Sequence, residues 1–251
     1  MLALLLLLAD APSPETLFQT AIARHEAQTS KKFTYREELE QWADGKMKSV
    51  NTYDVIMLEG ENYRKLILVD GKPLDAKLQK QVDEDLEKTR ATRRRSLRTV
   101  TRTLNSGGLR DIPRLFSLTV AGEETINGRK TWRVEATPNP NYKPANKDEE
   151  SLRNTRRTYW FDQADGIDIK SLTVYTKTTN SFQPGTEIEV HLAAVNGVWV
   201  PDRIFFRYDL KAMAFMKARG EARHRYFDHK LFEAESKLLP AAPIPEAAIR
   251  D

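Results

Sequence analysis

The chain has 251 residues, of which 40% are hydrophobic and 30% charged, and its formal net charge is +4. This composition is too apolar for a disordered chain and too polar for a membrane-embedded one, and the charge excess is too small to indicate a nucleic-acid-binding protein. With 0 Cys in the sequence, disulfides, thiolate metal sites, cysteine nucleophiles and a lipid-modified N-terminal Cys are not expected.

The first twelve residues contain a leucine run followed by Ala9-Asp10-Ala11, the small-x-small pattern of a signal-peptide cleavage site. The run is far too short to span a bilayer. No basic residue precedes it and Pro12 follows it, so a misassigned start codon or an attached apolar helix are the alternatives. We expect residues 1–12 to be a signal-peptide remnant, and the protein to be periplasmic, freely soluble and monomeric.

A helix is predicted from Pro14 to about Ser30. Ser13 is a good N-cap residue, and proline is favoured at the first helical position. Leu17, Phe18, Ala21 and Ile22 then recur at helical spacing. This apolar stripe should pack on a sheet.

Three strands are predicted next, over residues 33–42, 49–58 and 63–69. Each is followed by an acidic residue and a glycine, a typical hairpin signal, at Asp44-Gly45, Glu59-Gly60 and Asp70-Gly71. In residues 75–104 the apolar residues recur at helical spacing, which predicts one helix or two. The first half of this segment is acidic and the second half basic, an order that suits the helix dipole. Ser106-Gly107-Gly108 is expected to end this segment.

The remaining strands are predicted over residues 115–120, 129–137, 156–162, 168–178, 186–195, 198–210 and 213–229. Asn127-Gly128 and Asn196-Gly197 mark two hairpin turns. Most of these segments alternate apolar and polar residues, which indicates a sheet with one dry face. We therefore expect a mainly β (α+β) fold: a strongly curved antiparallel half-barrel of about ten strands, with helices covering the concave face, over residues 13–232. A Pro/Ala-rich tail follows over residues 233–251.

Catalytic and metal-binding motifs are not evident. The sequence has four histidines, and His224 and His229 are expected on opposite faces of one strand. Glu37-Glu38 and Glu187 with Glu189 are available as carboxylate pairs. Glu187 and Glu189 point the same way on a strand, opposite Ile188 and Val190, so they are expected on the solvated face and not in a cleft. We therefore predict no enzyme activity, no cofactor and no metal, with a hydrolase that uses exposed carboxylates as a remaining alternative.

The apolar strand faces are the best candidate for a ligand site. If the registers hold, one face of the second half of the sheet would line an apolar cavity with these residues: Trp132, Val134, Tyr159, Phe161, Leu172, Val174, Ile188, Val190, Leu192, Phe206 and Tyr208. The alternative is a core filled by the protein's own side chains. Five arginines of the second helical segment could bind an anionic headgroup or a partner, or could simply be solvated: Arg93, Arg94, Arg95, Arg98 and Arg102.

Four motifs carry a family resemblance: Tyr-Arg-Glu at residues 35–37, Asp-Gly-Lys-Pro-Leu at 70–74, the proline-rich loop at 137–144, and Trp-Phe-Asp at 160–162. The predicted order of elements resembles that of the LolA/LolB/LppX-like superfamily of periplasmic lipoprotein carriers. The four motifs resemble those of outer-membrane lipoprotein-sorting-like proteins in particular. The resemblance spans residue 14 to about 232. It implies a curved sheet with helices in its concavity, and it transfers no individual ligand residue.

The function expected from these observations is a periplasmic carrier or sensor that binds lipid or lipoprotein acyl chains in a concave apolar cavity. Its partners would include a membrane-bound donor or acceptor, and nucleic acid is not expected. The helices at residues 14–30 and 75–104 would act as lid and plug. The main alternative is an envelope interaction or sensor domain with a filled core and no lipid ligand.

Overall fold

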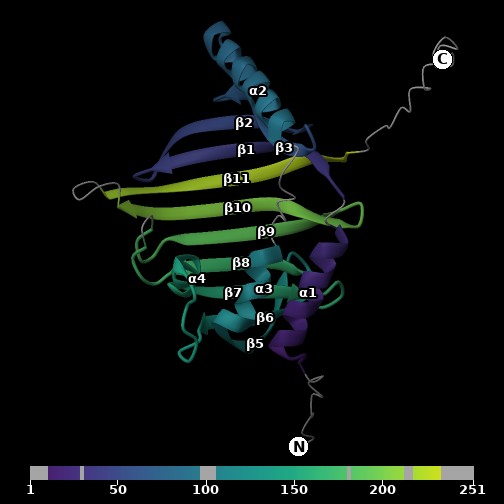
Figure 1. Ribbon diagram of the computed structural model, residues 1–251, viewed down its shortest axis with the longest axis vertical. Coiled ribbons are helices and arrows are strands. Elements are labelled where there is room, and N and C mark those ends of the chain that lie inside the picture. Colours follow the sequence, from purple (N-terminus) through teal and green to yellow (C-terminus); the bar gives the residue numbers. More distant parts are fainter. Residues whose placement is uncertain (1–10, 29–30, 97–105, 180–181, 212–216, 233–251) are drawn as a thin grey trace, which may run out of the picture.

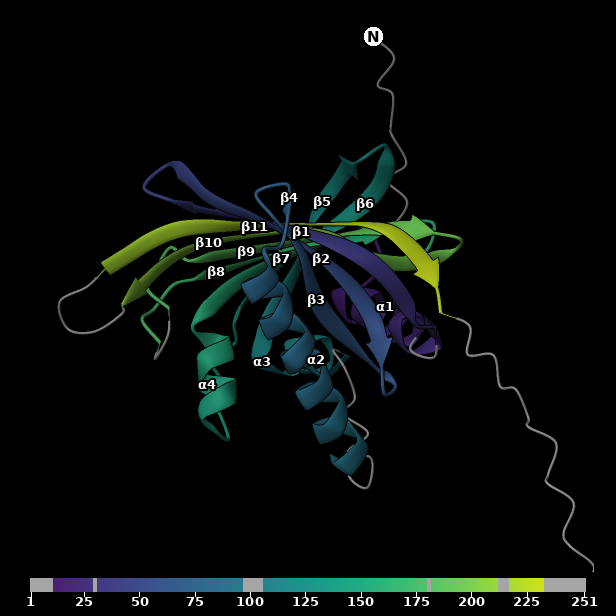
Figure 2. The same cartoon turned by 90° about the horizontal axis from the view of Figure 1, so that it is seen from above.

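The computed structural model describes residues 11–28, 31–96, 106–179, 182–211 and 217–232. Within these residues the chain forms one antiparallel sheet of 11 strands, with the order β4-β3-β2-β1-β11-β10-β9-β8-β7-β6-β5. The first and last strands of this order do not pair, so the sheet stays open. Figure 1 shows the strands stacked along the long axis of the molecule, and Figure 2 shows how strongly the sheet twists. The predicted curved half-barrel is confirmed, with eleven strands rather than about ten.

The strands have the following bounds: β1 Phe33–Ala43, β2 Lys46–Leu58, β3 Glu61–Val69, β4 Lys72–Pro73, β5 Phe116–Ile126, β6 Arg129–Pro138, β7 Thr155–Asp162, β8 Asp168–Tyr175, β9 Glu187–Val195, β10 Val198–Lys211 and β11 Lys217–Leu231. The described segments also form four helices: α1 Pro14–Gln28, α2 Ala76–Ser96, α3 Ser106–Leu115 and α4 Lys147–Arg153. The two-residue strand β4 is the additional one. The predicted start of the last strand at Met213, and both terminal segments, fall outside the described residues.

The hairpin turns form where the sequence predicts them. Asp44, Glu59, Asp70, Asn127 and Asn196 all have φ values between 48° and 51°, and each is followed by a glycine with positive φ. This pair of left-handed residues is what a tight type I′ turn needs, and its twist matches that of the flanking strands. Strands that follow each other in the sequence pair as neighbours, except β4 and β5, which lie at opposite edges of the sheet; the last strand, β11, returns to pair with β1.

The main core lies between α1, α3 and the strands β5–β7. Phe18 of α1 and Ile112 and Leu115 of α3 are completely buried against Val134 and Phe161 of the sheet. Figure 1 shows both helices in front of this half of the sheet. The helix α3 differs from the sequence expectation, because Ser106-Gly107-Gly108 begins a helix instead of ending one. Tertiary burial of Ile112 and Leu115 outweighs the low helix propensity of the two glycines.

Candidate functional site

The residues predicted to line a cavity on β6 and β7 lie beneath α1. Val134, Tyr159 and Phe161 are 0%, 5% and 0% exposed. The ring of Phe18 lies 5.0 Å from the rings of both Tyr159 and Phe161, with edge-to-face geometry. Leu17 and Ala21 complete the contact. The apolar stripe of α1 therefore occupies the position at which a hydrocarbon ligand was expected.

Strand pairing places the other predicted lining residues. Tyr159 pairs with Ser171, and Ser171 pairs with Val190. Directly paired residues of antiparallel strands share a face, so Val190 lies on the face that carries Tyr159, which we call the inner face. By alternation and pairing, five further predicted residues share it: Trp132, Ile188, Leu192, Phe206 and Tyr208.

Leu172 and Val174 are not brought together with the other predicted lining residues. They pair with Glu189 and Glu187, so they lie on the opposite face, which we call the outer face. On β8 the inner face carries Ser171 and Thr173, and the apolar residues between and after them face outward. The apolar character of Leu172 and Val174 alone does not reveal which face they occupy. The remaining nine residues stay together on the inner face.

Away from α1, the inner face of β1, β3 and β11 holds a charged cluster that sequence reasoning missed. The carboxylate of Glu37 is only 3% exposed. Arg64 Nε lies 2.6 Å from Glu37 Oε2, and Arg64 Nη2 donates to Oε1 at 2.8 Å. His224 Nδ1 lies 2.6 Å from the same Oε1. We call these three residues the Glu37 cluster.

Tyrosines surround the Glu37 cluster. The guanidinium of Arg64 lies 4.2 Å from the ring centroid of Tyr53, and Tyr226 stacks on His224 at 6.2 Å with 13° between the ring planes. Tyr35 meets Tyr226 edge to face at 5.7 Å. Burial, with a smaller contribution from the Glu37 carboxylate, raises the pKa of both Tyr35 and Tyr226. Both phenols are therefore neutral hydroxyl groups at physiological pH.

The sequence does contain a signal for this cluster. Phe33, Tyr35, Glu37 and Leu39 are alternate residues of β1, so they share one face, and Phe33 and Leu39 are buried. A carboxylate within such an apolar row must be paired, because burying an unpaired charge is strongly unfavourable. Its neighbour Glu38 lies on the outer face, where Arg225 Nη2 donates to it at 2.9 Å. Of these two adjacent carboxylates, Glu37 is therefore buried and Glu38 faces solvent.

The helix α2 lies along β3 at one edge of the sheet. The hydroxyl of Tyr63 donates to Asp85 at 2.8 Å, and Lys65 lies 3.1 Å from Asp83. Burial, together with the hydrogen bond to Asp85, raises the pKa of Tyr63 to about 12. Tyr63 and Lys65 alternate with Arg64 along the strand, so α2 contacts the side of β3 opposite to the Glu37 cluster.

Two of the five predicted docking arginines connect α2 to the β2–β3 turn. Arg93 donates to the backbone carbonyls of Leu58, Glu61 and Asn62, each at 2.9 Å, and Arg94 donates to Glu59 at 2.9 Å. Arg95 belongs to α2, while Arg98 and Arg102 lie outside the described residues. Arg93 is therefore committed to the protein's own backbone.

The Arg93→Ala variant should loosen α2 from the sheet, because it leaves three carbonyl groups without this donor. We expect amide hydrogen exchange in residues 76–94 to accelerate by about tenfold, since a lost hydrogen bond to a charged group costs about 1.5 kcal/mol or more. Arg90→Ala is the matched control, because Arg90 pairs with Glu87 within the same helix. Unchanged exchange in Arg93→Ala would contradict the anchoring role.

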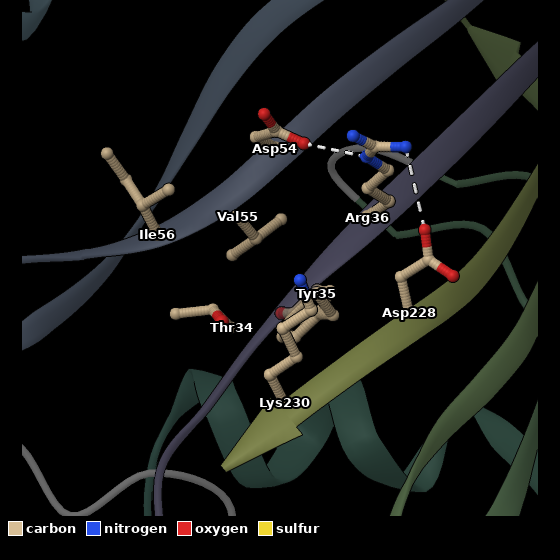
Figure 3. Close-up of a pocket in the computed structure, with 8 residues that line it drawn as sticks. All are labelled: Thr34, Tyr35, Arg36, Asp54, Val55, Ile56, Asp228 and Lys230. Carbon is tan, nitrogen blue, oxygen red and sulfur yellow. Dashed lines mark hydrogen bonds and ion pairs between the residues drawn. The ribbon is translucent and has the colours of Figure 1, made fainter. Parts of the chain in front are cut away.

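The outer face is dominated by ion pairs and carries two open hollows. One, of about 310 Å³, lies among Glu187, Glu189, Phe205, Arg207 and Arg223, among others. The other, of about 210 Å³, is lined in part by Arg36, Asp54, Asp228 and Lys230, and Figure 3 shows Arg36 between the two aspartates. Both hollows are bordered by charged side chains, so neither resembles an acyl-chain cavity.

A bulge in β11 changes the predicted position of His229. Asp228 has a φ of 54° inside the strand, where the β1–β11 register shifts by one residue. The extra residue turns His229 to the inner side, where its ring lies 5.4 Å from that of Tyr35. His224 and His229 therefore face the same side of β11, contrary to the sequence expectation. Burial lowers the pKa of His229.

The described part of the chain contains no group of three His, Cys, Asp or Glu side chains arranged to hold a metal ion. Among the helices of the described residues, none is long and apolar enough to cross a membrane.

An open, curved antiparallel sheet with helices packed on one half of its inner face defines the class of fold. No protein-family model matches the sequence, and no curated protein matches it. Solved structures with a similar fold include a DUF1329 family protein from Desulfovibrio piger (TM-score 0.40, 9% identity, 88% of this chain and 94% of that chain). A LolA superfamily protein from Nitrosomonas europaea is similar to the same degree (TM-score 0.40, 11% identity, 89% of this chain and 95% of that chain).

A third similar structure is an outer membrane lipoprotein-sorting protein domain from Vibrio parahaemolyticus (TM-score 0.38, 8% identity, 88% of this chain and 95% of that chain). The structural neighbours therefore include the superfamily that the sequence resembles. At these TM-scores and identities, the likeness carries no argument about function.

Proposed function

We propose that the protein is a non-enzymatic lipid-binding protein of the cell envelope, a carrier or a sensor that takes an acyl chain on the inner face of its sheet. The observation that carries the proposal is the apolar contact of α1, in which Phe18 lies on Tyr159 and Phe161. A helix that covers apolar sheet residues with its own apolar stripe can exchange that stripe for a hydrocarbon chain. Burial of an acyl chain is worth roughly 0.8 kcal/mol per methylene, which can offset the apolar burial that the displaced helix gives up.

In the described part of the chain, polar contacts from α1 to the strands are made by His25 and Gln28, at one end of the helix. His25 Nε2 lies 2.6 Å from Asp168 Oδ1 on β8, and Gln28 accepts a hydrogen bond from the backbone N–H of Trp199 at 2.8 Å. Both residues lie near the C-terminal end of α1. The N-terminal half is held by the apolar contact of Phe18 and its neighbours.

A disulfide that locks α1 tests this proposal directly. A Cβ built on Gly166 would lie 3.7 Å from Thr20 Cβ, a separation that suits a disulfide, and the chain has no cysteine to compete. In the Thr20→Cys/Gly166→Cys double variant, oxidation should abolish uptake of a fluorescent fatty acid by delipidated protein. Reduction should restore it. The positive φ of Gly166 makes some loss of stability expected, so folding is checked by circular dichroism.

The matched control is the wild-type protein under the same oxidising and reducing conditions, which should take up the probe equally in both. Equal uptake by the oxidised and reduced double variant would contradict a site beneath α1. A flat titration for folded wild-type protein would reject acyl-chain binding altogether.

The second candidate is an envelope interaction domain with a filled core. The complete burial of Val134 and Phe161 favours it, because these positions already have protein partners. Such a domain would bind its partner through exposed surfaces, with α1 staying in place. Native mass spectrometry after gentle extraction separates the two candidates, since a co-purified lipid is expected only for the first.

A further inference from the structure

The geometry points to a phosphate-binding site at the Glu37 cluster, which would receive the headgroup of an anionic lipid. This inference rests on the proposed lipid-binding function and adds the chemical class of the headgroup. The site lies on the same inner face as the residues under α1, at the other half of the sheet. Its donors come from Arg64, Tyr53 and Tyr226.

Arg64 is held in a fixed orientation. Glu37 binds its Nε and Nη2 atoms, and the Tyr53 ring lies beneath its guanidinium plane at 4.2 Å. The side chain is nevertheless 46% exposed. A guanidinium has five N–H donors, so the carboxylate leaves others for a ligand. Fixed, partly exposed arginines of this kind suit phosphate oxygens, because little side-chain entropy is lost on binding.

The charge of Glu37 does not block an anion. Its two oxygens accept from Arg64 at 2.6 and 2.8 Å, and His224 lies 2.6 Å from Oε1. With both partners in place, the carboxylate acts as the support that orients Arg64 and His224. A bidentate carboxylate pair fixes the geometry of an arginine, and such support preorganises the donors of a binding site.

The neighbouring hydroxyl groups are donors. Tyr226 and Tyr53 pair with Glu37 from either side, so their side chains flank it on the inner face. The raised pKa of Tyr226 keeps its hydroxyl protonated. Asn51 donates to the Tyr53 hydroxyl at 3.4 Å, which leaves the hydrogen of Tyr53 to donate elsewhere. Donors on the residues that flank a partly exposed arginine suit a phosphate, whose oxygens only accept.

The test compares two amphiphiles with the same chain and different headgroups. Isothermal titration with dodecyl phosphate should give binding at least about tenfold tighter than with uncharged dodecyl maltoside, because a charge-assisted hydrogen bond contributes on that order. The Arg64→Ala variant should lose this difference. Tyr226→Phe should reduce the difference in affinity. Because this variant removes only a hydroxyl group, it provides the test if Arg64→Ala does not fold.

Arg225→Ala is the matched control. Arg225 also donates to a carboxylate, Glu38, and lies 4.7 Å from an aromatic ring, that of Phe227, but on the outer face. It should keep the full preference for dodecyl phosphate. A preference that persists in both Arg64→Ala and Tyr226→Phe would overturn the site.

Failure of the inference and failure of the proposed function give different results. Equal affinity for the two amphiphiles in the wild-type protein would overturn the phosphate site and leave acyl-chain binding intact. No binding of either would reject the proposed function together with the site. If inorganic phosphate binds as tightly as dodecyl phosphate, the site does not select a lipid headgroup, and the assignment to an anionic lipid is rejected.

Discussion

Replacing Phe18 with alanine should lower the free energy of unfolding by about 3–5 kcal/mol, the usual range for a buried phenylalanine. Phe18 is 0% exposed and contacts Tyr159 and Phe161, with 5.0 Å between ring centroids in both pairs. The variant loses this aromatic contact and leaves a cavity between α1 and the sheet. Urea denaturation followed by circular dichroism measures the change.

Phe205→Ala is the control for the Phe18 variant. Phe205 is 37% exposed on the outer face, so its removal should cost much less, about 1 kcal/mol. A comparable loss in both variants would mean that the contact between α1 and the sheet is not a main source of stability. If the cavity left by Phe18→Ala also increases fatty-acid uptake, the proposed exchange of α1 for an acyl chain gains direct support.

Replacing Glu37 with glutamine should destabilise the fold by about 2–3 kcal/mol. The amide has the shape of the carboxylate but only one acceptor oxygen, so it cannot accept from both Nε and Nη2 of Arg64, and its NH₂ group meets one donor of this cluster with another donor. Removing one partner of a buried ion pair leaves the others unsatisfied. The expected cost lies below the largest reported for such pairs because Arg64 is 46% exposed and regains water.

Glu38→Gln is a control that differs by a single position. Glu38 is paired with Arg225 on the solvated face, so its replacement should cost less than about 1 kcal/mol. Chemical denaturation of the two variants at the same pH and salt concentration compares them directly. Equal stabilities would mean that the Glu37 cluster is not a structural support for the inner face, and would weaken its role in orienting Arg64.

Local signals in the sequence predict most of the fold. The acidic-Gly and Asn-Gly pairs place five hairpin turns correctly because the left-handed backbone they allow is a local property. The helix α1 is predicted within two residues of its end for the same reason, since its cap and apolar stripe are local. Strand alternation then identifies an antiparallel sheet with one dry face.

Features that depend on distant residues were harder to predict. The helix α3 contains two glycines in its first turn and is stabilised by packing against α1 and β5, which no local pattern reveals. The Glu37 cluster joins β1, β3 and β11, so its partners become apparent only when the strand order is known. The bulge at Asp228 likewise reverses the expected side of His229, because one inserted residue exchanges the two faces of a strand.

The pairing of β1 with β11 has a consequence for biogenesis. These strands join residues 33–43 with residues 220–231, almost the full length of the described chain apart. During synthesis from the N-terminus, the edge of β1 that pairs with β11 has no partner until the last strand arrives. The nascent protein is therefore exposed to mispairing and aggregation for most of its synthesis. Loss of even the final strand would leave that edge permanently open, so a chaperone that shields β1 is of greatest benefit to this protein before its C-terminal segment emerges.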